Sequence, residues 1–194
     1  MSCAGLILAA GESRRMGRPK ALLPYGGETF LDRLVRLFAE RCSPVVVVLG
    51  AEAAAIRAAS APRALFVENP DYRLGQTTSM QCGLRALKEA AEGILFTLVD
   101  HPAVSEATLD ALLRERPGPA PLVRLPRYQG RRGHPIWFAR ALAAEFLALP
   151  PTGAARDVVH RHADRTEFLD LDDPAIVADI DDPAAYRALT GGSA

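Results

Sequence analysis

An alternation of short apolar runs with segments of helical spacing constrains the fold more than any other feature of the sequence. The apolar runs have the continuous hydrophobic character of strands that are covered on both faces, and they cover residues 6–8, 45–49, 64–67 and 94–99. The intervening helical spacing predicts helices over residues 30–38, 52–59, 80–87 and 109–113. We therefore expect an α/β fold: a three-layer α/β/α sandwich with a Rossmann-like, mostly parallel sheet and right-handed crossovers.

The pattern changes in the last third of the chain. Short strands over 122–125 and 133–138 flank an arginine-rich stretch, which predicts a small antiparallel excursion of the sheet. The remaining expected elements are helices over 139–148 and 154–162, strands near Phe168 and Ala178, and a last helix that Asp182 caps and Pro183 opens. We expect one domain over residues 1–190 and a loose tail over 191–194.

Composition excludes several classes of protein. Lys and Arg number 23 and so do Asp and Glu, so the 194-residue chain has no net charge with which to bind nucleic acid. Cys3, Cys42 and Cys82 are far apart and form no C-x-x-C pair, which is typical of a reduced, cytoplasmic chain. The apolar run from Cys3 to Ala10 is too short to span a membrane, so we expect no membrane association.

A glycine-containing loop directly follows the first predicted strand. It reads LAAGESRRMGRPK over residues 8–20, and its small residues would let backbone amides approach an anion. Arg15 and Lys20 add positive charge that suits a triphosphate. The loop is neither a Walker A sequence nor G-x-G-x-x-G, and the alternative interpretation is a surface turn with solvated cations. Lys20 and Lys88 are the only lysines in the chain, which singles out the lysine that ends this loop.

The same string resembles the signature L-A-A-G-x-S-x-R-M-G-x-P-K of the MobA-like nucleotidyltransferases, and within them the molybdenum cofactor cytidylyltransferases. Four further segments are similar to family motifs in the right order: N-P…G-Q-T-T-S-M over 69–80, D-H-P over 100–102, R-G-H-P over 132–135 and D-I-D-D-P over 179–183. The resemblance implies the fold of the nucleotide-diphospho-sugar transferases.

The resemblance also implies roles for individual residues. Arg15, Lys20 and Asp100 are expected to be catalytic. Arg132, Gly133 and His134 are expected to bind the acceptor. The expected nucleotide contacts are Leu8, Ala9, Ala10, Gly11, Ser13, Arg15, Lys20, Asn69, Gly75 and Ser79.

Asp100 is also a candidate from its position alone, because it follows the fourth predicted strand and ligands of open α/β sheets bind beyond the carboxyl ends of strands. A carboxylate there could hold Mg²⁺ together with substrate phosphates, or simply cap the next turn. Asp179 and Asp181 lie two apart on a predicted strand and so on one face. Through the family motif we expect Asp181 to complete the metal site with Asp100, for Mg²⁺ or alternatively Mn²⁺.

Two features leave the acceptor open. A cluster of arginines around a predicted turn could grip the phosphate of a second substrate or be an exposed hairpin tip; its members are Arg124, Arg127, Arg131 and Arg132. In addition, Thr152 and Ala154 stand where the family has an aspartate and a glycine, and Gln76 replaces the usual methionine.

The expected reaction transfers CMP from CTP to the terminal phosphate of molybdopterin and releases pyrophosphate. CTP is favoured because cytidylyl members of the family read L-A-A-G where guanylyl members read L-A-G-G, so the choice depends on Ala10. The alternatives are GTP as donor, another phosphate acceptor (a sugar phosphate or a phospholactate-like compound), or a non-catalytic molybdenum cofactor carrier. The expected partners are nucleotide, phosphorylated pterin and a molybdoenzyme client.

Overall fold

A mixed, mostly parallel sheet lies at the centre of the computed structural model, which describes residues 2–60, 63–87, 91–115 and 117–191. The main-sheet strands are β1 (Cys3–Ala9), β4 (Val45–Leu49), β5 (Leu65–Glu68), β6 (Gly93–Leu98), β7 (Val123–Tyr128), β8 (Arg131–Arg132), β9 (Ile136–Ala139) and β10 (Thr166–Asp170). The α-helices are α1 (Phe30–Ala39), α2 (Ala53–Ala59), α3 (Gln76–Ala86), α4 (Glu106–Leu113), α5 (Ala143–Leu147), α6 (Ala155–Arg161) and α7 (Pro183–Thr190).

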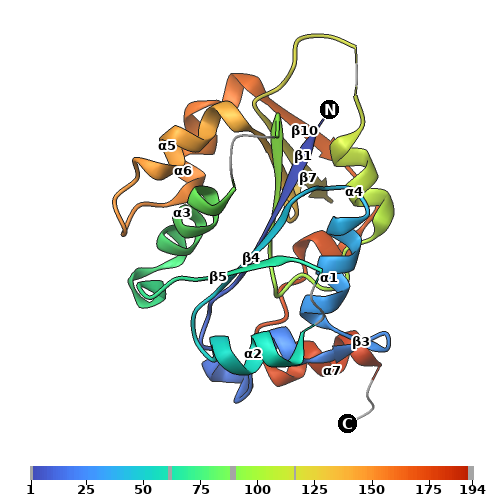
Figure 1. Ribbon diagram of the computed structural model, residues 1–194. Coiled ribbons are helices and arrows are strands. Elements are labelled where there is room, and N and C mark those ends of the chain that lie inside the picture. The colour runs from blue at the N-terminus through green and yellow to red at the C-terminus, as the bar shows by residue number, and fades with distance from the viewer. Residues whose placement is uncertain (1, 61–62, 88–90, 116, 192–194) are drawn as a thin grey trace.

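The strand order is β10-β7-β9-β6-β1-β4-β5, with β8 paired to β7 (Figure 1). β1 pairs in parallel with both β4 and β6, and β5 continues the parallel set. β9 runs antiparallel to both of its neighbours, β6 and β7. The prediction of a mostly parallel sheet with a small antiparallel excursion is confirmed.

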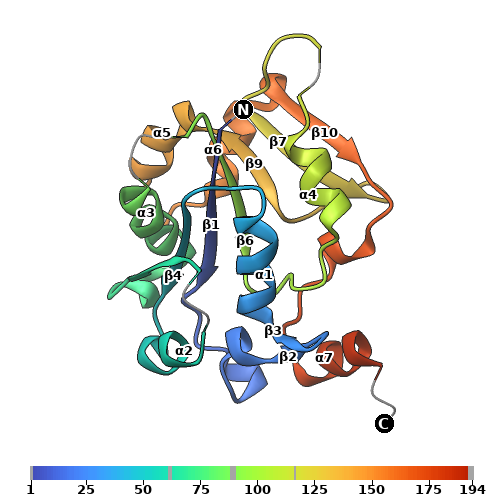
Figure 2. The same cartoon turned by 45° about the vertical axis from the view of Figure 1, so that its right-hand side comes forward.

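Helices cover both faces of the sheet, as the alternating side chains of β1 require. Ile7 packs with α1, α2 and α4, whereas Leu6 and Leu8 pack with α3, α5 and α6 on the opposite face. Figures 1 and 2 show α3 and α5 on one side of the strands and α1 and α4 on the other. The expected three-layer sandwich is therefore present.

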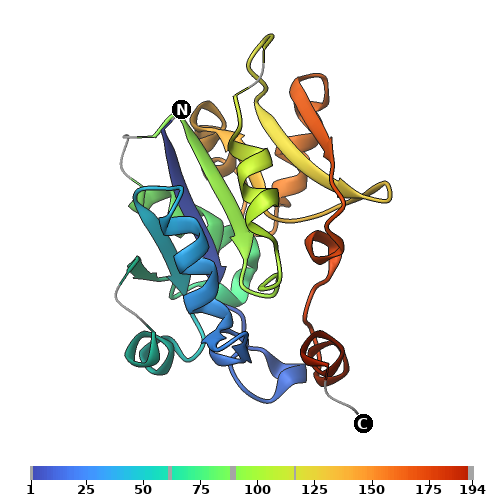
Figure 3. The same cartoon turned by 90° about the vertical axis from the view of Figure 1, so that its right-hand side faces the viewer.

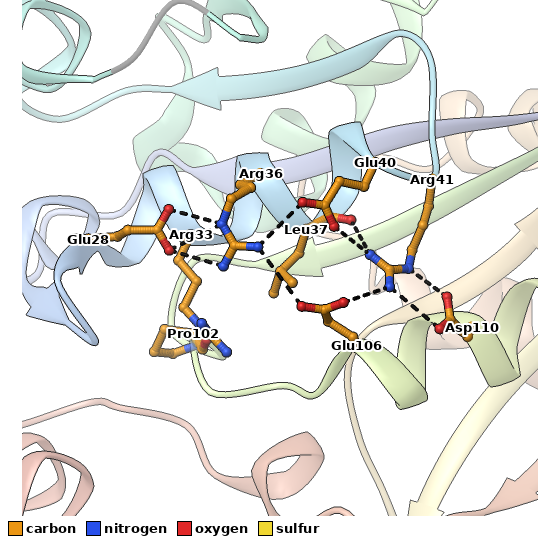
Figure 4. Close-up of polar contacts among 9 residues, drawn as sticks. All are labelled: Glu28, Arg33, Arg36, Leu37, Glu40, Arg41, Pro102, Glu106 and Asp110. Carbon is orange, nitrogen blue, oxygen red and sulfur yellow. Dashed lines mark hydrogen bonds and ion pairs between the residues drawn. The ribbon is translucent and has the colours of Figure 1, made fainter.

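Ion pairs join α1 and the turn after it to α4 on one outer layer (Figure 4). Arg36 of α1 contacts Glu106 of α4 at 4.0 Å and Glu28 of β3 at 3.0 Å. Arg41, which follows α1, contacts Asp110 of α4 at 2.7 Å and Glu106 at 3.2 Å. Bonds to these acids raise the pKa of Arg41 above its usual range, so the guanidinium stays charged. The network holds α4 against α1, and α4 follows the loop that carries Asp100.

A C-terminal strap, which we define as residues 171–191, crosses below the sheet to the loop that follows β1 (Figure 3). Ile180 packs with Met16, Leu23 and Phe30 in a small separate apolar cluster. The hydroxyl of Tyr186 in α7 donates to the carbonyl of Pro24 at 2.8 Å. The strap therefore brings the end of the chain to the segment that follows the first strand.

Several local expectations need correction. Residues 178–182 are irregular and not a strand, because this part of the strap pairs with no described strand and Ile180 N donates to the Asp100 carbonyl beyond the end of β6. A two-strand hairpin, β2 (Pro24–Tyr25) and β3 (Glu28–Thr29), was not predicted from the sequence. The last helix does begin at Asp182 and Pro183 as expected, with the Asp182 side chain accepting from Ala184 N at 2.9 Å. Of the expected tail, Gly191 ends α7 and residues 192–194 lie outside the described residues.

No described helix combines the length and the hydrophobicity that a membrane crossing needs.

Candidate active site

The loop after β1 folds back on itself. The backbone N–H groups of Met16 and Gly17 donate to the Ser13 carbonyl at 2.9 and 3.2 Å, and the Lys20 N–H donates to the Ser13 hydroxyl at 3.0 Å. Ser13 adopts a left-handed conformation with φ of 51°. These bonds return the chain toward the end of β1 and fix where the Lys20 side chain starts.

Asp100 lies on the neighbouring strand end. β6 pairs with β1 in parallel, and the pairing extends past the strands because Val99 N donates to the Leu8 carbonyl at 3.0 Å. The Lys20 ammonium lies 3.6 Å from Asp100 Oδ2, with only 12% of the Lys20 side chain exposed. Asp100 Oδ1 is buried without a hydrogen-bond partner among the described residues, and His101 Nε2 lies 3.7 Å away.

Asp181 of the strap contacts both cations of the loop. Lys20 Nζ donates to Asp181 Oδ1 at 2.5 Å and Arg15 Nη2 donates to Oδ2 at 2.6 Å. The bond to Lys20, with a smaller effect of Arg15, lowers the pKa of the Asp181 carboxyl. Asp179, expected on the same face, is exposed, because the strand that would have aligned the two does not form.

These groups surround a pocket of about 330 Å³, which we call the first pocket. Of the predicted site residues, ten line it: Leu8, Ala9, Ala10, Gly11, Ser13, Arg15, Lys20, Ser79, Asp100 and Asp181. Ile56, Tyr72 and Gln76 also line it and were not predicted as contacts. Tyr72 lies two residues after the N-P motif, and this position could have indicated that it lines the pocket. Nothing in the sequence pointed to Ile56, because it has the pattern of an ordinary core residue.

Asn69 and Gly75 do not line the first pocket. Asn69 is buried and its amide is fully engaged: Nδ2 donates to the hydroxyls of Thr78 and Ser79 at 2.9 and 3.0 Å, and Oδ1 accepts from Asp71 N at 3.0 Å. Asn69 thus positions the start of α3, and its expected direct contact with nucleotide stays a prediction. Ser79 lies within the first turns of α3, which starts at Gln76 and not at Ser79.

A second pocket, of about 560 Å³, adjoins the first. It contains the three expected acceptor residues, Arg132, Gly133 and His134, and Gly75 lies on its wall. The rest of its lining is largely apolar, and Arg156 and His160 are charged or polar exceptions. The other lining residues are Leu74, Thr77, Met80, Phe96, Leu125, Ile136, Phe146, Pro151, Thr152, Gly153, Ala154, Ala155 and Val159. Of the described lining residues, Gln76 alone belongs to both pockets.

His134 is a neutral member of the second pocket. Burial, with a smaller effect of the neighbouring His101, lowers the pKa of His134 to about 3. The two imidazole rings lie 5.0 Å apart between centroids. His134 therefore offers a hydrogen-bonding ring at neutral pH and no positive charge.

The predicted arginine cluster does not act as one group. Arg124 is buried, donates to the Leu112 carbonyl at 2.8 Å and pairs with Glu167 at 3.0 Å. Arg127 forms an ion pair with Asp170. Arg132 alone among these four described residues lines the first or the second pocket, and its guanidinium also stacks on Phe168 at 5.0 Å. Arg124 lines a third pocket, elsewhere on the molecule, together with Glu167.

The residues around the first pocket fit a divalent cation. The buried, unpartnered Asp100 Oδ1 is an acceptor that such an ion would satisfy, and the Asp181 carboxylate lies near the same ammonium. Within the described part of the chain, no group of three or more His, Cys, Asp or Glu is placed to hold a metal. An ion here would therefore share ligands with phosphate and water, as Mg²⁺ commonly does.

A folded-back loop with two cations, facing a strand-end carboxylate in an open α/β sheet, is the arrangement of proteins that bind and transfer nucleotides. Comparison with known families gives the same class, because residues 5–166 match the model of the MobA-like NTP transferase domain. The chain belongs to this family.

Curated relatives differ in their named activities. The chain is 34% identical to a nicotine blue oxidoreductase of Paenarthrobacter nicotinovorans, over 95% of each chain. It is 32% identical to a probable molybdenum cofactor guanylyltransferase of Mycobacterium ulcerans, over 97% of this chain and 93% of the relative. The molybdenum cofactor cytidylyltransferase of Escherichia coli is 27% identical, over 92% and 90%. The family is as expected, whereas the expected particular likeness to the cytidylyltransferases is not reflected in these identities.

Solved structures agree on the fold. The crystal structure of Rv0371c from Mycobacterium tuberculosis superposes with a TM-score of 0.84 at 31% identity, covering 98% of each chain. A crystal structure of Rv0371c in complex with manganese superposes with a TM-score of 0.80, at the same identity and over the full length of both chains.

Proposed function

We propose that the protein transfers CMP from CTP to the phosphate of molybdopterin and releases pyrophosphate. The observation that carries the proposal is the convergence of Lys20, Arg15 and Asp100 on the first pocket, directly beside a second pocket of different chemistry. The first pocket would take the triphosphate donor, and the second the acceptor with its flat pterin ring.

In the proposed reaction an oxygen of the acceptor phosphate attacks the α-phosphorus of the nucleotide. The bond from that phosphorus to the oxygen bridging the β-phosphate breaks, and this oxygen leaves with the electron pair as part of pyrophosphate. Lys20 and Arg15 would hold the departing phosphates and neutralise the charge that develops on them. Asp100 would help to hold Mg²⁺ or Mn²⁺, which supplies further charge neutralisation when bound.

The second pocket supports a phosphorylated heterocyclic acceptor. Phe96, Met80 and Phe146 offer apolar surface to a flat ring, and Arg132 and Arg156 offer positive charge to a phosphate. Thr152 and Ala154, which depart from the family pattern, line this pocket and not the first one. These two residues would therefore affect the choice of acceptor and leave the donor chemistry unchanged. A sugar phosphate or a phospholactate-like compound is the alternative to molybdopterin as acceptor.

CTP is proposed as donor from Ala10, a buried residue that lines the first pocket. Its methyl group narrows the pocket toward a pyrimidine, although one methyl supplies only about 1–3 kcal/mol of discrimination. The relatives named guanylyltransferases argue for GTP. Thermal unfolding with each nucleotide decides the matter, because the preferred ligand stabilises the fold more; a larger shift with GTP reverses the choice.

The direct test incubates the protein with each nucleoside triphosphate, Mg²⁺ and molybdopterin, and identifies the product by mass spectrometry. A molybdopterin dinucleotide with stoichiometric pyrophosphate supports the proposal. Pyrophosphate release only with a sugar phosphate or phospholactate would support the alternative acceptor. Tight binding of molybdopterin without pyrophosphate release from any nucleotide would instead support a carrier.

A second candidate function follows from the relative named nicotine blue oxidoreductase, whose similarity covers 95% of this chain. The apolar second pocket could accept an aromatic compound of that kind. The test follows the visible absorbance of nicotine blue with the protein and NADH or NADPH. Enzyme-dependent bleaching supports this function, and unchanged absorbance beside an active transferase assay excludes it.

A further inference from the structure

The two loop cations that should bind phosphate already have an anionic partner within the chain. Both oxygens of Asp181 are engaged, one by Lys20 at 2.5 Å and the other by Arg15 at 2.6 Å. A phosphate that binds either cation therefore competes with Asp181 for its positive charge. The same carboxylate is a candidate ligand for a divalent ion, so it has two alternative partners.

The backbone around Asp181 is held in place, whereas its side chain is held by the two ion pairs and is partly exposed. On one side, Ile180 N donates to the Asp100 carbonyl at 2.9 Å, and on the other Asp182 caps α7. The Asp181 side chain itself is 36% exposed. A rotation about its own side-chain bonds would thus move the carboxylate from the cations toward Asp100 without moving the strap.

The charges around the first pocket determine how the position of the Asp181 carboxylate affects nucleotide binding. Arg15 and Lys20 carry two positive charges, and Asp100 and Asp181 carry two negative charges, so these four groups sum to zero; Arg14, which also lines the pocket, is paired with Glu12. A triphosphate without metal would compete with Asp181 for the cations and lie beside two carboxylates that share their counter-ions with it, which costs electrostatic free energy. A triphosphate with a divalent ion brings positive charge for both carboxylates and frees both cations for its oxygens.

We propose that Asp181 is a specificity determinant that restricts the first pocket to metal-bound nucleotide. It competes with phosphate for Lys20 and Arg15 until an ion draws it away. The inference rests on the proposed function, because it takes the first pocket to be a nucleotide site. Asp181 lies outside residues 5–166, the part of the chain that the family model matches.

The experiment measures dissociation constants of CTP and GTP by calorimetry, once with Mg²⁺ and once with excess chelator. The variants are Asp181→Asn and Asp181→Ser, and the matched control is Asp179→Asn, because Asp179 is exposed and lies outside both pockets. Circular dichroism and thermal unfolding check that each variant is folded. No acceptor is needed, so binding is read independently of turnover.

For the wild-type protein and Asp179→Asn we expect tight binding only with Mg²⁺. For both Asp181 variants we expect metal-free nucleotide to bind about tenfold more tightly than it does to the wild type, which corresponds to about 1.4 kcal/mol. If these variants bind metal-free nucleotide no more tightly than the wild type does, and the wild type binds nucleotide with Mg²⁺, the inference about Asp181 is overturned and the proposed function is not. If the wild type binds neither nucleotide with Mg²⁺, the proposed function fails together with it.

Discussion

Arg33 on helix α1 donates its Nε–H to the carbonyl of Pro102 at 2.8 Å, two residues beyond Asp100 (Figure 4). The same loop is held from the other side, because the buried carboxylate of Asp173 accepts from Ser105 N at 3.0 Å and from the Thr108 hydroxyl at 2.7 Å. These bonds lower the pKa of Asp173 despite its burial, so it stays ionised in this position. Asp100 is therefore positioned by contacts in which its own side chain takes no part.

It follows that Asp100→Ala should abolish turnover and leave the fold intact. We expect pyrophosphate release with molybdopterin to fall by about a hundredfold or more, since a metal-binding carboxylate supplies several kcal/mol of transition-state stabilisation. The urea midpoint should change little, because the loop bonds of Pro102 and Ser105 remain. Near-normal pyrophosphate release by the folded variant would refute the assignment of Asp100.

Lys20→Met should reduce kcat/KM far more than Arg15→Met. Lys20 is mostly buried and lies near both acids, whereas 67% of the Arg15 side chain is exposed, where solvent weakens its interactions. We expect about a hundredfold loss for Lys20→Met and about tenfold for Arg15→Met in the pyrophosphate assay. Arg18→Met is the control, because Arg18 stacks over Tyr186 outside the pocket. Equal losses in all three variants would show that general positive charge, and not position, matters.

Gly133→Ala should destabilise the fold. A Cβ at Gly133 would lie 2.1 Å from the Ile176 carbonyl oxygen, and a backbone atom of the strap cannot move away as a flexible side chain can. Overpacking of this kind costs about 1–3 kcal/mol, to be measured by urea unfolding. For stability alone, Gly11→Ala is the control, because a Cβ there meets nothing within 4 Å. Equal stability of both variants would contradict the close contact between Gly133 and the strap.

Lowering the pH should destabilise the fold because of His134. Its pKa is about 3 in the fold and ordinary, near 6.5, once unfolded, so the unfolded state binds the extra proton between these values. The contribution of His134 is complete above pH 6.5 and is lost as the pH falls toward 3, by up to about 1.4 kcal/mol per pH unit. Urea unfolding between pH 7 and 5 measures the slope, and His134→Gln should flatten it. A slope that the substitution leaves unchanged would assign the effect to other groups.

Local sequence pattern predicted the centre of the sheet well. Residues 45–49 form β4 as expected, because a run of valines between a helix and a turn suits a strand covered on both faces. The same logic failed for the segment near Ala178, where alternating residues lie on an irregular strap that has no neighbouring strand to pair with. A strand needs hydrogen-bonded neighbouring strands, and the residues of a segment alone do not show whether the fold supplies them.

In the candidate site, too, some contacts could be predicted from the sequence and others depend on the folded chain. Lys20 and Asp100 could be placed near each other because each follows a strand of a parallel sheet, and such ends share an edge. The bond between Lys20 and Asp181 spans 161 positions in the sequence, and no local spacing predicts it. The bonds of Asn69 and Arg124 could not be predicted for a related reason: their polar groups are satisfied by buried partners that only the folded chain brings close.

Gln76 lines both pockets, and it is itself one of the residues that depart from the family pattern. If the first pocket binds the donor and the second the acceptor, as proposed, evolution could exchange either reactant without rebuilding the pocket of the other. The relatives carry three different named activities, and a substitution at Gln76 would alter both pockets at once.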